Sequence, residues 1–190
     1  MTSSKQAEMR LSLHNIIAST TFSYTVVGLT ALLLLGVADA AKAQRVLPEP
    51  EGTVLLRIAG DIGLTNQGNE AHFDRKMIKA LPGQVLKTGT SVTEGVNRFE
   101  GVLMRDILAK VEANGETVVA TALNDYVAEI PMDDFRDYDV LAALSMDGER
   151  LLPRDKGPIW IVYPRDDFQE LQDIRYDYRW VWQLMHIEVR

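Results

Sequence analysis

The hydrophobic positions of the chain fall into a dense apolar run near the N-terminus and, after it, short apolar segments separated by turn residues. Residues 22–37 are predominantly apolar, follow a segment that carries Lys and Arg, and lead into the Ala-rich residues 38–43. This order is typical of a secretory signal peptide at 1–43, with cleavage after Ala43 favoured over cleavage after Ala40. An uncleaved anchor over 16–37 is the alternative. Both place the rest of the chain outside the cytoplasm, so we expect a periplasmic location.

Beyond this run, the pattern predicts short strands and a few helices. Residues 44–52 hold two prolines among charges and are typical of a flexible linker, so we expect the folded domain at 53–190. The expected strands, which are short apolar or alternating runs bounded by turn residues, are 54–60, 84–93, 117–123, 126–130, 140–146, 151–152, 159–163 and 184–189. The expected helices are 70–81, a helix that follows 99–108 and ends near Asn114, and a short helix opened by Pro131.

Strands interleaved with two or three short helices predict an α+β domain with a mixed, mainly β core. Tight turns such as Asp147-Gly148 fit hairpin connections within such a core. A doubly wound sheet is not expected, because neither a dinucleotide-binding glycine pattern nor a P-loop occurs in the sequence.

Charge and cysteine content exclude some classes of function. The net charge is −7, and removal of residues 1–43 takes away three basic and two acidic residues, which makes it −8. Such an acidic domain lacks the clustered Lys and Arg that nucleic acid requires, so no nucleic-acid partner is expected. The chain has no cysteine, so its stability must come from packing rather than disulfides.

Hydrolytic or metal chemistry finds little support in the sequence. His14, His72 and His186 are isolated, and no G-x-S-x-G motif occurs. We expect His72 on the surface of the first helix and His186 as a structural or rim residue of the last strand. The pair Asp133-Asp134 follows a proline and is expected at a helix N-terminus. The pair Asp166-Asp167 begins a loop, 165–178, that is expected to face a partner or cover a pocket.

Aromatic residues concentrate late in the chain. They are Trp160, Tyr163, Phe168, Tyr176, Tyr178, Trp180 and Trp182. In a regular strand Trp180 and Trp182 would lie on the same face and, beside Arg179 and Tyr178, offer a stacking surface for a flat heteroaromatic ligand. Packing of both indoles in the core is equally compatible with the sequence.

Several segments, in this order, carry a resemblance to a known family. They are FEGVL at 99–103 with DIL at 106–108, NDY at 124–126 running to Ile130-Pro131, LA at 141–142 running to Asp147-Gly148, PRDKGP at 153–158, and WQL at 182–184 with IEV at 187–189. As a set they resemble the sulfite oxidase-type molybdopterin-binding domain over nearly the whole chain after the leader. The resemblance implies a compact version of that fold.

At several positions that the resemblance aligns, this sequence differs from the enzymes of the family. The cysteine that ligates molybdenum would fall near residues 90–93, where the sequence offers only hydroxyls. Lys156 stands where the enzymes commonly place a histidine and Trp160 where they place an arginine. The segment 180–182 stands where a basic residue and main-chain groups hold the pterin and its phosphate. Loss of thiolate and cationic groups with gain of indoles suits a smaller, uncharged pterin.

A cysteine-less subset of exported proteins with this fold binds free pterins. Its members act as periplasmic adaptors on a membrane-bound diguanylate cyclase/phosphodiesterase that controls cyclic-di-GMP and biofilm formation. The resemblance therefore implies a non-catalytic pterin-binding sensor whose partner is the periplasmic domain of a membrane signalling protein, with the domain itself not embedded in the membrane and molybdenum not expected. The alternatives are a molybdopterin-dependent oxidoreductase with atypical metal ligation and an interaction domain with a collapsed pocket.

The implied ligand-binding residues have roles that the sequence leaves open. The pterin ring would stack on Trp182 or Trp160, Asp125 or Asp155 would accept hydrogen bonds from its aminopyrimidine edge, and Arg154 or Arg179 would donate to its oxygen. The full set is Thr90, Thr93, Asn124, Asp125, Tyr126, Arg154, Asp155, Lys156, Trp160, Arg179, Trp180 and Trp182. No catalytic or metal-binding residue is expected.

Overall fold

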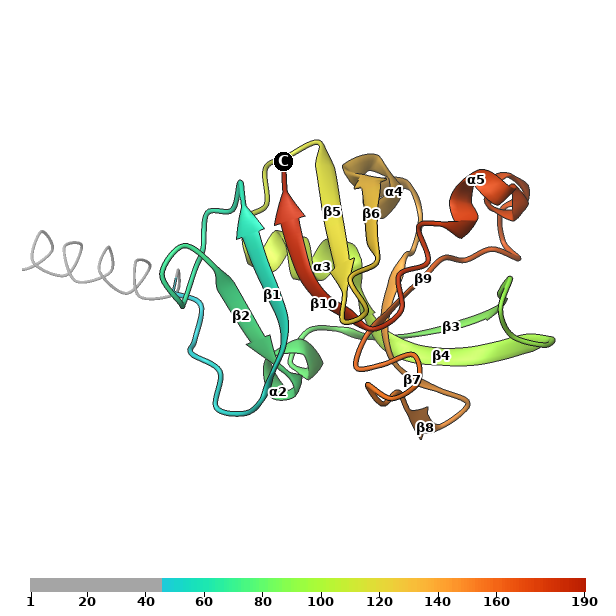
Figure 1. Ribbon diagram of the computed structural model, residues 1–190, viewed down its shortest axis with the longest axis horizontal. Helices are drawn as coiled ribbons and strands as arrows, with labels where there is room; N and C mark the ends of the chain where they lie inside the picture. The colour runs from blue at the N-terminus through green and yellow to red at the C-terminus, as the bar shows by residue number, and fades with distance from the viewer. Residues whose placement is uncertain (1–45) are drawn as a thin grey trace, which may run out of the picture. The chain divides into compact units, whose positions relative to one another are not determined.

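The computed structural model describes residues 46–190, which form one compact unit (Figure 1). The expected signal peptide at 1–43 and the first two residues of the expected linker lie outside the described residues. Among residues 46–190 no helix has the length and apolar character needed to cross a membrane.

The first sheet joins the start and the end of the domain. Its strands are β1 (Val54–Gly60), β2 (Ala71–Asp74), β5 (Thr117–Ala122), β6 (Val127–Pro131) and β10 (Leu184–Val189). Their order is β2-β1-β10-β5-β6, with β1 and β10 parallel and the other pairs antiparallel (Figure 1). The last strand therefore lies in the middle of this sheet.

The second sheet is antiparallel throughout. It consists of β3 (Gly83–Gly89), β4 (Val96–Leu103), β7 (Leu141–Met146), β8 (Glu149–Arg150) and β9 (Trp160–Val162), in the order β3-β4-β7-β8 with β9 paired to β7. A bulge in β4 brings Gly101 against the backbone of β7, where an added Cβ would collide with the Ala142 carbonyl oxygen. This close approach explains why glycine occupies the position.

Short helices connect the strands. They are α2 (Arg75–Lys79), α3 (Met104–Lys110), α4 (Met132–Asp137), the 3₁₀ helix η1 (Gln169–Gln172) and α5 (Ile174–Asp177). The helix α3 buries Met104, Ile107 and Leu108 in the common core. The expected α+β class with a mixed, mainly β core is confirmed.

The structure corrects the expected helix at 70–81. Residues Ala71–Asp74 form β2 instead, and only Arg75–Lys79 are helical. Antiparallel pairing with β1, which sets Phe73 opposite Leu56, overrides the helical spacing of the apolar residues. His72 therefore lies on a strand, half-buried, with Nε2 2.7 Å from Glu70 Oε2, and not on a helix surface.

Three other expected boundaries are wrong. The helix α3 ends at Lys110 rather than near Asn114, and Glu112 has a positive φ of 53° that is incompatible with a continuing helix. Residues Glu149–Arg150, not 151–152, form the short strand that pairs with β7. The strand β3 ends at Gly89 rather than at residue 93. Residues 180–182, which would share a face only in a regular strand, are not a strand.

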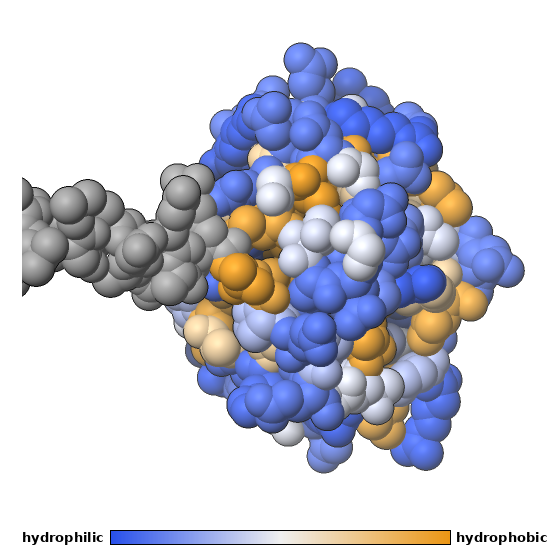
Figure 2. Space-filling model, turned by 90° about the vertical axis from the view of Figure 1, so that its left-hand side faces the viewer, coloured by the Kyte–Doolittle hydropathy of each residue, from blue (hydrophilic) through white to orange (hydrophobic). Residues whose placement is uncertain are grey.

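The described part of the expected linker is fastened to the domain. Leu47 is 2% exposed within the core, and the carbonyl oxygen of Pro48 accepts a 2.7 Å hydrogen bond from Asn66 Nδ2. The Asp74 carboxylate accepts hydrogen bonds from the backbone N–H groups of Glu51 and Gly52 at 2.9 and 2.8 Å. On the face shown in Figure 2, hydrophilic residues surround several small apolar patches.

Candidate functional site

Two segments of the expected site are fastened to each other by one side chain. We call residues 153–158 and 180–184 the clasp. Gln183, which has a positive φ of 55°, donates from Nε2 to the carbonyl oxygens of Pro153 and Asp155 at 2.7 and 3.0 Å. Its backbone N–H donates to the Lys156 carbonyl oxygen at 3.0 Å. Arg154, Asp155 and Lys156 are thereby held beside the tryptophans that follow along the chain.

The turn between β5 and β6 joins the clasp. It contains Asn124, Asp125 and Tyr126, and Asp125 has a positive φ of 64°. The Leu123 N–H donates to the Gln183 carbonyl oxygen at 2.9 Å, and the Tyr126 hydroxyl donates to the Tyr178 carbonyl oxygen at 2.7 Å. The structure therefore brings this turn next to the clasp.

Three indoles meet inside the clasp. Trp160, on β9, is fully buried, Trp180 is 4% exposed, and Trp182 is half-buried. The ring centroids of Trp180 and Trp182 each lie 6.4 Å from that of Trp160, in edge-on geometry. The two later indoles thus flank Trp160 and do not form the flat, strand-like stacking surface that the sequence suggests. Lys156 Nζ lies 5.8 Å from the Trp160 ring, within cation–π range.

Two of these indoles have an unmet hydrogen-bond donor. The Nε1 atoms of Trp160 and Trp180 are buried and have no acceptor within residues 46–190. A buried donor without an acceptor is unfavourable by about 1–3 kcal/mol, so such groups are rare without a ligand or an ordered water.

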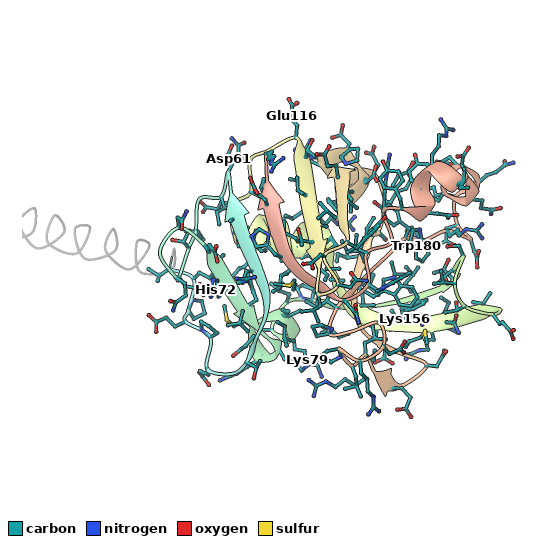
Figure 3. All side chains as sticks on the ribbon, viewed as in Figure 1. Asp61, His72, Lys79, Glu116, Lys156 and Trp180 are labelled. Carbon is teal, nitrogen blue, oxygen red and sulfur yellow. The ribbon has the colours of Figure 1, made fainter. Side chains whose placement is uncertain are left out.

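In Figure 3, Trp180 and Lys156 lie well away from His72 on β2.

Arg179 is held by a buried carboxylate. Its Nη1 donates to Asp134 Oδ2 at 2.6 Å, and the Tyr163 hydroxyl donates to the same oxygen at 2.7 Å. Burial alone would lower the pKa of Arg179, but its hydrogen bonds to Asp134 and Tyr178 outweigh burial and raise it. Burial, followed by the Asp134 charge, raises the pKa of Tyr163 well above its ordinary value. In this arrangement the Arg179 charge is paired within the protein.

The sequence alone does not indicate this network. The expected position of Asp133 and Asp134 at a helix N-terminus is confirmed by α4, which has both in its first turn. The partners Asp134 and Arg179 are 45 residues apart, and no local motif connects them. Gln183 was also missed as the residue that fastens the clasp, although it belongs to the WQL segment that carries the family resemblance.

Thr90 and Thr93 form a separate hydroxyl network at the turn between β3 and β4. Their Oγ1 atoms lie 2.7 Å apart, and Thr93 Oγ1 donates to Asn97 Oδ1 at 2.6 Å. The neighbouring Gly89 N–H donates to Asp166 Oδ2 at 2.6 Å, which attaches the start of the 165–178 loop to the end of β3. The hydroxyls of both threonines are thus engaged within the turn.

Two cavities flank the clasp. One of about 280 Å³ is lined by Leu123, Pro153, Pro158 and Met185 together with residues of β1, and its lining is mainly apolar. The other, of about 190 Å³, includes Arg154 and Asp155 of the expected site in its lining. The volume of the larger cavity is close to the lower end of typical ligand pockets, about 300 Å³. The lining of these two cavities does not include Trp160, Trp180 or Trp182.

Metal-binding side chains do not gather in the described part of the chain. Within residues 46–190 no group of three or more His, Cys, Asp or Glu side chains is placed to hold a metal ion. His186, on β10, has its pKa lowered, first by burial and then by the Arg57 charge. Its place in the sheet fits the structural role expected from the sequence.

The comparisons with known proteins concern the family and the fold. The profile of the oxidoreductase molybdopterin binding domain matches residues 65–167, more than half of the chain. No curated protein matches the chain significantly. Among solved structures, the crystal structure of the sulfane dehydrogenase SoxCD from Paracoccus pantotrophus is similar, with a TM-score of 0.54 and 18% identity over 70% of this chain. The chain spans 37% of that structure's chain, and the likeness concerns the fold.

Proposed function

Because the chain belongs to the oxidoreductase molybdopterin binding domain family, we propose that it binds a free pterin at the clasp as a non-catalytic sensor in the periplasm. Its output is relayed to the periplasmic domain of a membrane-bound enzyme of cyclic-di-GMP metabolism. The N-terminal sequence pattern supports the location, and the resemblance to the cysteine-less subset supports the partner.

The observation that carries the ligand proposal is the pair of unmet indole donors. The buried Nε1–H groups of Trp160 and Trp180 have no hydrogen-bond acceptor within the described residues. A pterin offers a carbonyl oxygen and ring nitrogens as acceptors, and its flat ring suits the half-buried Trp182. Asp125, in the turn between β5 and β6, and Asp155, in the clasp, supply carboxylates for the aminopyrimidine edge.

The donor set fits an organic pterin better than the molybdenum cofactor of the family. That cofactor, when bound, supplies redox chemistry at a metal held by a cysteine thiolate, and this chain contains no cysteine. Lys156, which could face a phosphate, has Nζ 3.2 Å from Asp155 Oδ1. We therefore derive no redox step from these residues.

An adaptor needs its partner-facing surface next to its ligand. Residues 165–178, which include η1 and α5 and are therefore not the plain loop that was expected, end beside the clasp and expose Ile174 by 80% and Tyr178 by 47%. Tyr126 bonds to this loop and is 42% exposed. The hydrogen bond from the Tyr126 hydroxyl to the Tyr178 carbonyl oxygen therefore connects the β5–β6 turn, where the ligand would bind, to the exposed side chains of Ile174 and Tyr178. This connection supports a role in protein–protein signalling.

Intrinsic fluorescence provides a direct test. Two of the three tryptophans of the chain, Trp180 and Trp182, are clasp residues and Trp160 packs against both, and oxidised pterins absorb where tryptophan emits. We expect saturable quenching when tetrahydropterins or oxidised pterins are added to the protein produced from its complete chain. Trp182→Phe should weaken binding while leaving the melting temperature nearly unchanged, because it removes part of the stacking surface of a half-buried residue.

Two results would overturn the proposal. Absence of saturable binding with every pterin would remove the ligand. Stoichiometric molybdenum in protein purified from its native host would favour the oxidoreductase alternative. If Trp182→Ala lowers stability but leaves the pterin response unchanged, the tryptophan is only structural.

A further inference from the structure

A cleft away from the clasp contains two arginines without counter-ions. The cleft has a volume of about 390 Å³ and lies between α2, the start of β1 and the β8 hairpin, which are found along the lower edge of the domain in Figure 1. Its charged lining residues are Glu51, Asp74, Arg75, Lys76 and Arg150. None of the lining residues belongs to the clasp.

Arg75 is poorly satisfied in this cleft. Its Nε and Nη2 atoms are buried and have no hydrogen-bond partner within residues 46–190. Burial lowers the pKa of Arg75, and the like charge of Arg150 lowers it further. Neither arginine makes an ion pair among the described residues, although the domain as a whole is acidic. Two neighbouring guanidinium groups without an anion repel each other.

The acidic residues of the cleft are already engaged. Asp74 Oδ1 accepts the Met77 N–H at 2.8 Å, and Asp74 Oδ2 accepts the two backbone N–H groups that hold the entry segment. Glu51 Oε2 pairs with Lys76 Nζ at 2.8 Å. The cleft therefore has three cationic and two anionic side chains, and the two cations that lack an ion pair within residues 46–190 are Arg75 and Arg150.

We propose that this cleft binds a phosphate group carried by a small molecule, with Arg75 and Arg150 as its ligands. The planar fork of a guanidinium matches the oxygens of a phosphate, and the donors of Arg75 are fixed by burial. A phosphate offers three strong acceptor oxygens to the two guanidinium groups, whereas a carboxylate offers two. The volume of the cleft exceeds that of one ion and leaves room for the organic part of a phosphate ester.

The test uses the protein produced from its complete chain, with inorganic phosphate as the probe and sodium chloride at equal ionic strength as the reference. We expect phosphate, but not chloride or acetate, to raise the melting temperature saturably, because a ligand that binds only the folded state stabilises it. Arg150→Gln and Arg75→Gln should each weaken phosphate binding about tenfold or more in calorimetric titration. Arg136→Gln, whose exposed side chain pairs with Asp133, is the control and should bind phosphate as the unmodified protein does.

A second readout separates a binding role from a structural one. In phosphate-free, low-salt buffer, Arg150→Gln should melt at or above the temperature of the unmodified protein, since it removes a like charge from Arg75. A purely structural Arg150 would make this variant melt lower. That result, or a phosphate response no larger than that of chloride or acetate, overturns the proposal. Tryptophan quenching by pterins is measured at the clasp, so failure of either proposal is distinguishable from failure of the other.

Discussion

Replacing Arg179 by Met should leave the Asp134 carboxylate buried without its cation. The Asp134 side chain is 9% exposed and that of Arg179 is 16% exposed, so solvent screens the pair weakly. Removal of one partner of a buried ion pair costs about 3–5 kcal/mol. The Tyr163 hydroxyl, which still donates to Asp134 at 2.7 Å, offsets part of this loss. We therefore expect the lower end of the range, about 3 kcal/mol.

This loss corresponds to a measurable fall in melting temperature. Unfolding entropy is about 2.1 cal/mol/K per residue, so the 145 residues from Val46 to Arg190 give about 0.3 kcal/mol/K. A loss of about 3 kcal/mol then lowers the melting temperature by about 10 °C. Scanning calorimetry and urea unfolding of Arg179→Met should agree on this figure.

A second ion pair on the same helix provides the control. Arg136 and Asp133 are 65% and 74% exposed, so Arg136→Met should change the free energy of unfolding by less than about 0.5 kcal/mol. The double variant Arg179→Met/Asp134→Leu should recover much of the stability lost in Arg179→Met, because it removes the unpaired charge as well. If Arg179→Met behaves like the control, or if the double variant is no more stable than Arg179→Met alone, the pair does not hold the segment as we infer.

Three further predictions follow from local contacts. Burial lowers the pKa of His186 below 6.5, so the unfolded chain takes up a proton at a higher pH than the folded chain does. The free energy of unfolding should therefore fall as the pH drops from about 6.5 through the lower pKa of the folded state. Urea midpoints measured against pH should show this fall, and His186→Gln should flatten it. Gly101→Ala should severely destabilise the domain because the new Cβ collides with the Ala142 carbonyl oxygen, whereas Gly83→Ala, with open space around it, should fold normally. Soluble yield and circular dichroism compare the two variants, and equal behaviour would contradict the close approach of Gly101 to β7. Gln183→Ala should cost about 1 kcal/mol and speed hydrogen exchange in residues 153–158; unchanged exchange there would mean that the clasp is held by other contacts.

Much of the β-structure could be predicted from local patterns. The expected strands near β5, β6, β7 and β10 agree with the observed ones within one or two residues, because these short apolar runs are bounded by clear turn residues. The helix predicted over 70–81 is wrong in its first half, because the apolar residues of this segment are divided between the strand β2 and the helix α2. Pairing with β1 determined the first half of that segment, and pairing partners are not visible in a local window.

The candidate site was predictable only in part. The segments that carry the family resemblance meet in space because Gln183 bonds to both the 153–158 loop and, through Leu123, the β5–β6 turn. The orientation of the tryptophans was not predictable, since the positive φ of Gln183 belongs to a loop and not to the regular strand that same-face geometry requires. The engagement of Arg179 by Asp134 depends on tertiary packing, which sequence spacing does not encode.

The central place of β10 has a consequence for biosynthesis. Its neighbours, β1 and β5, do not pair with each other, so a chain cut before Leu184 would split the first sheet into two hairpins with exposed inner edges. Closure of this sheet joins residues more than a hundred positions apart, as the pairing of Arg57 with His186 illustrates. Such distant pairings form slowly, and the nascent polypeptide remains dependent on protection from aggregation until its final strand has been added.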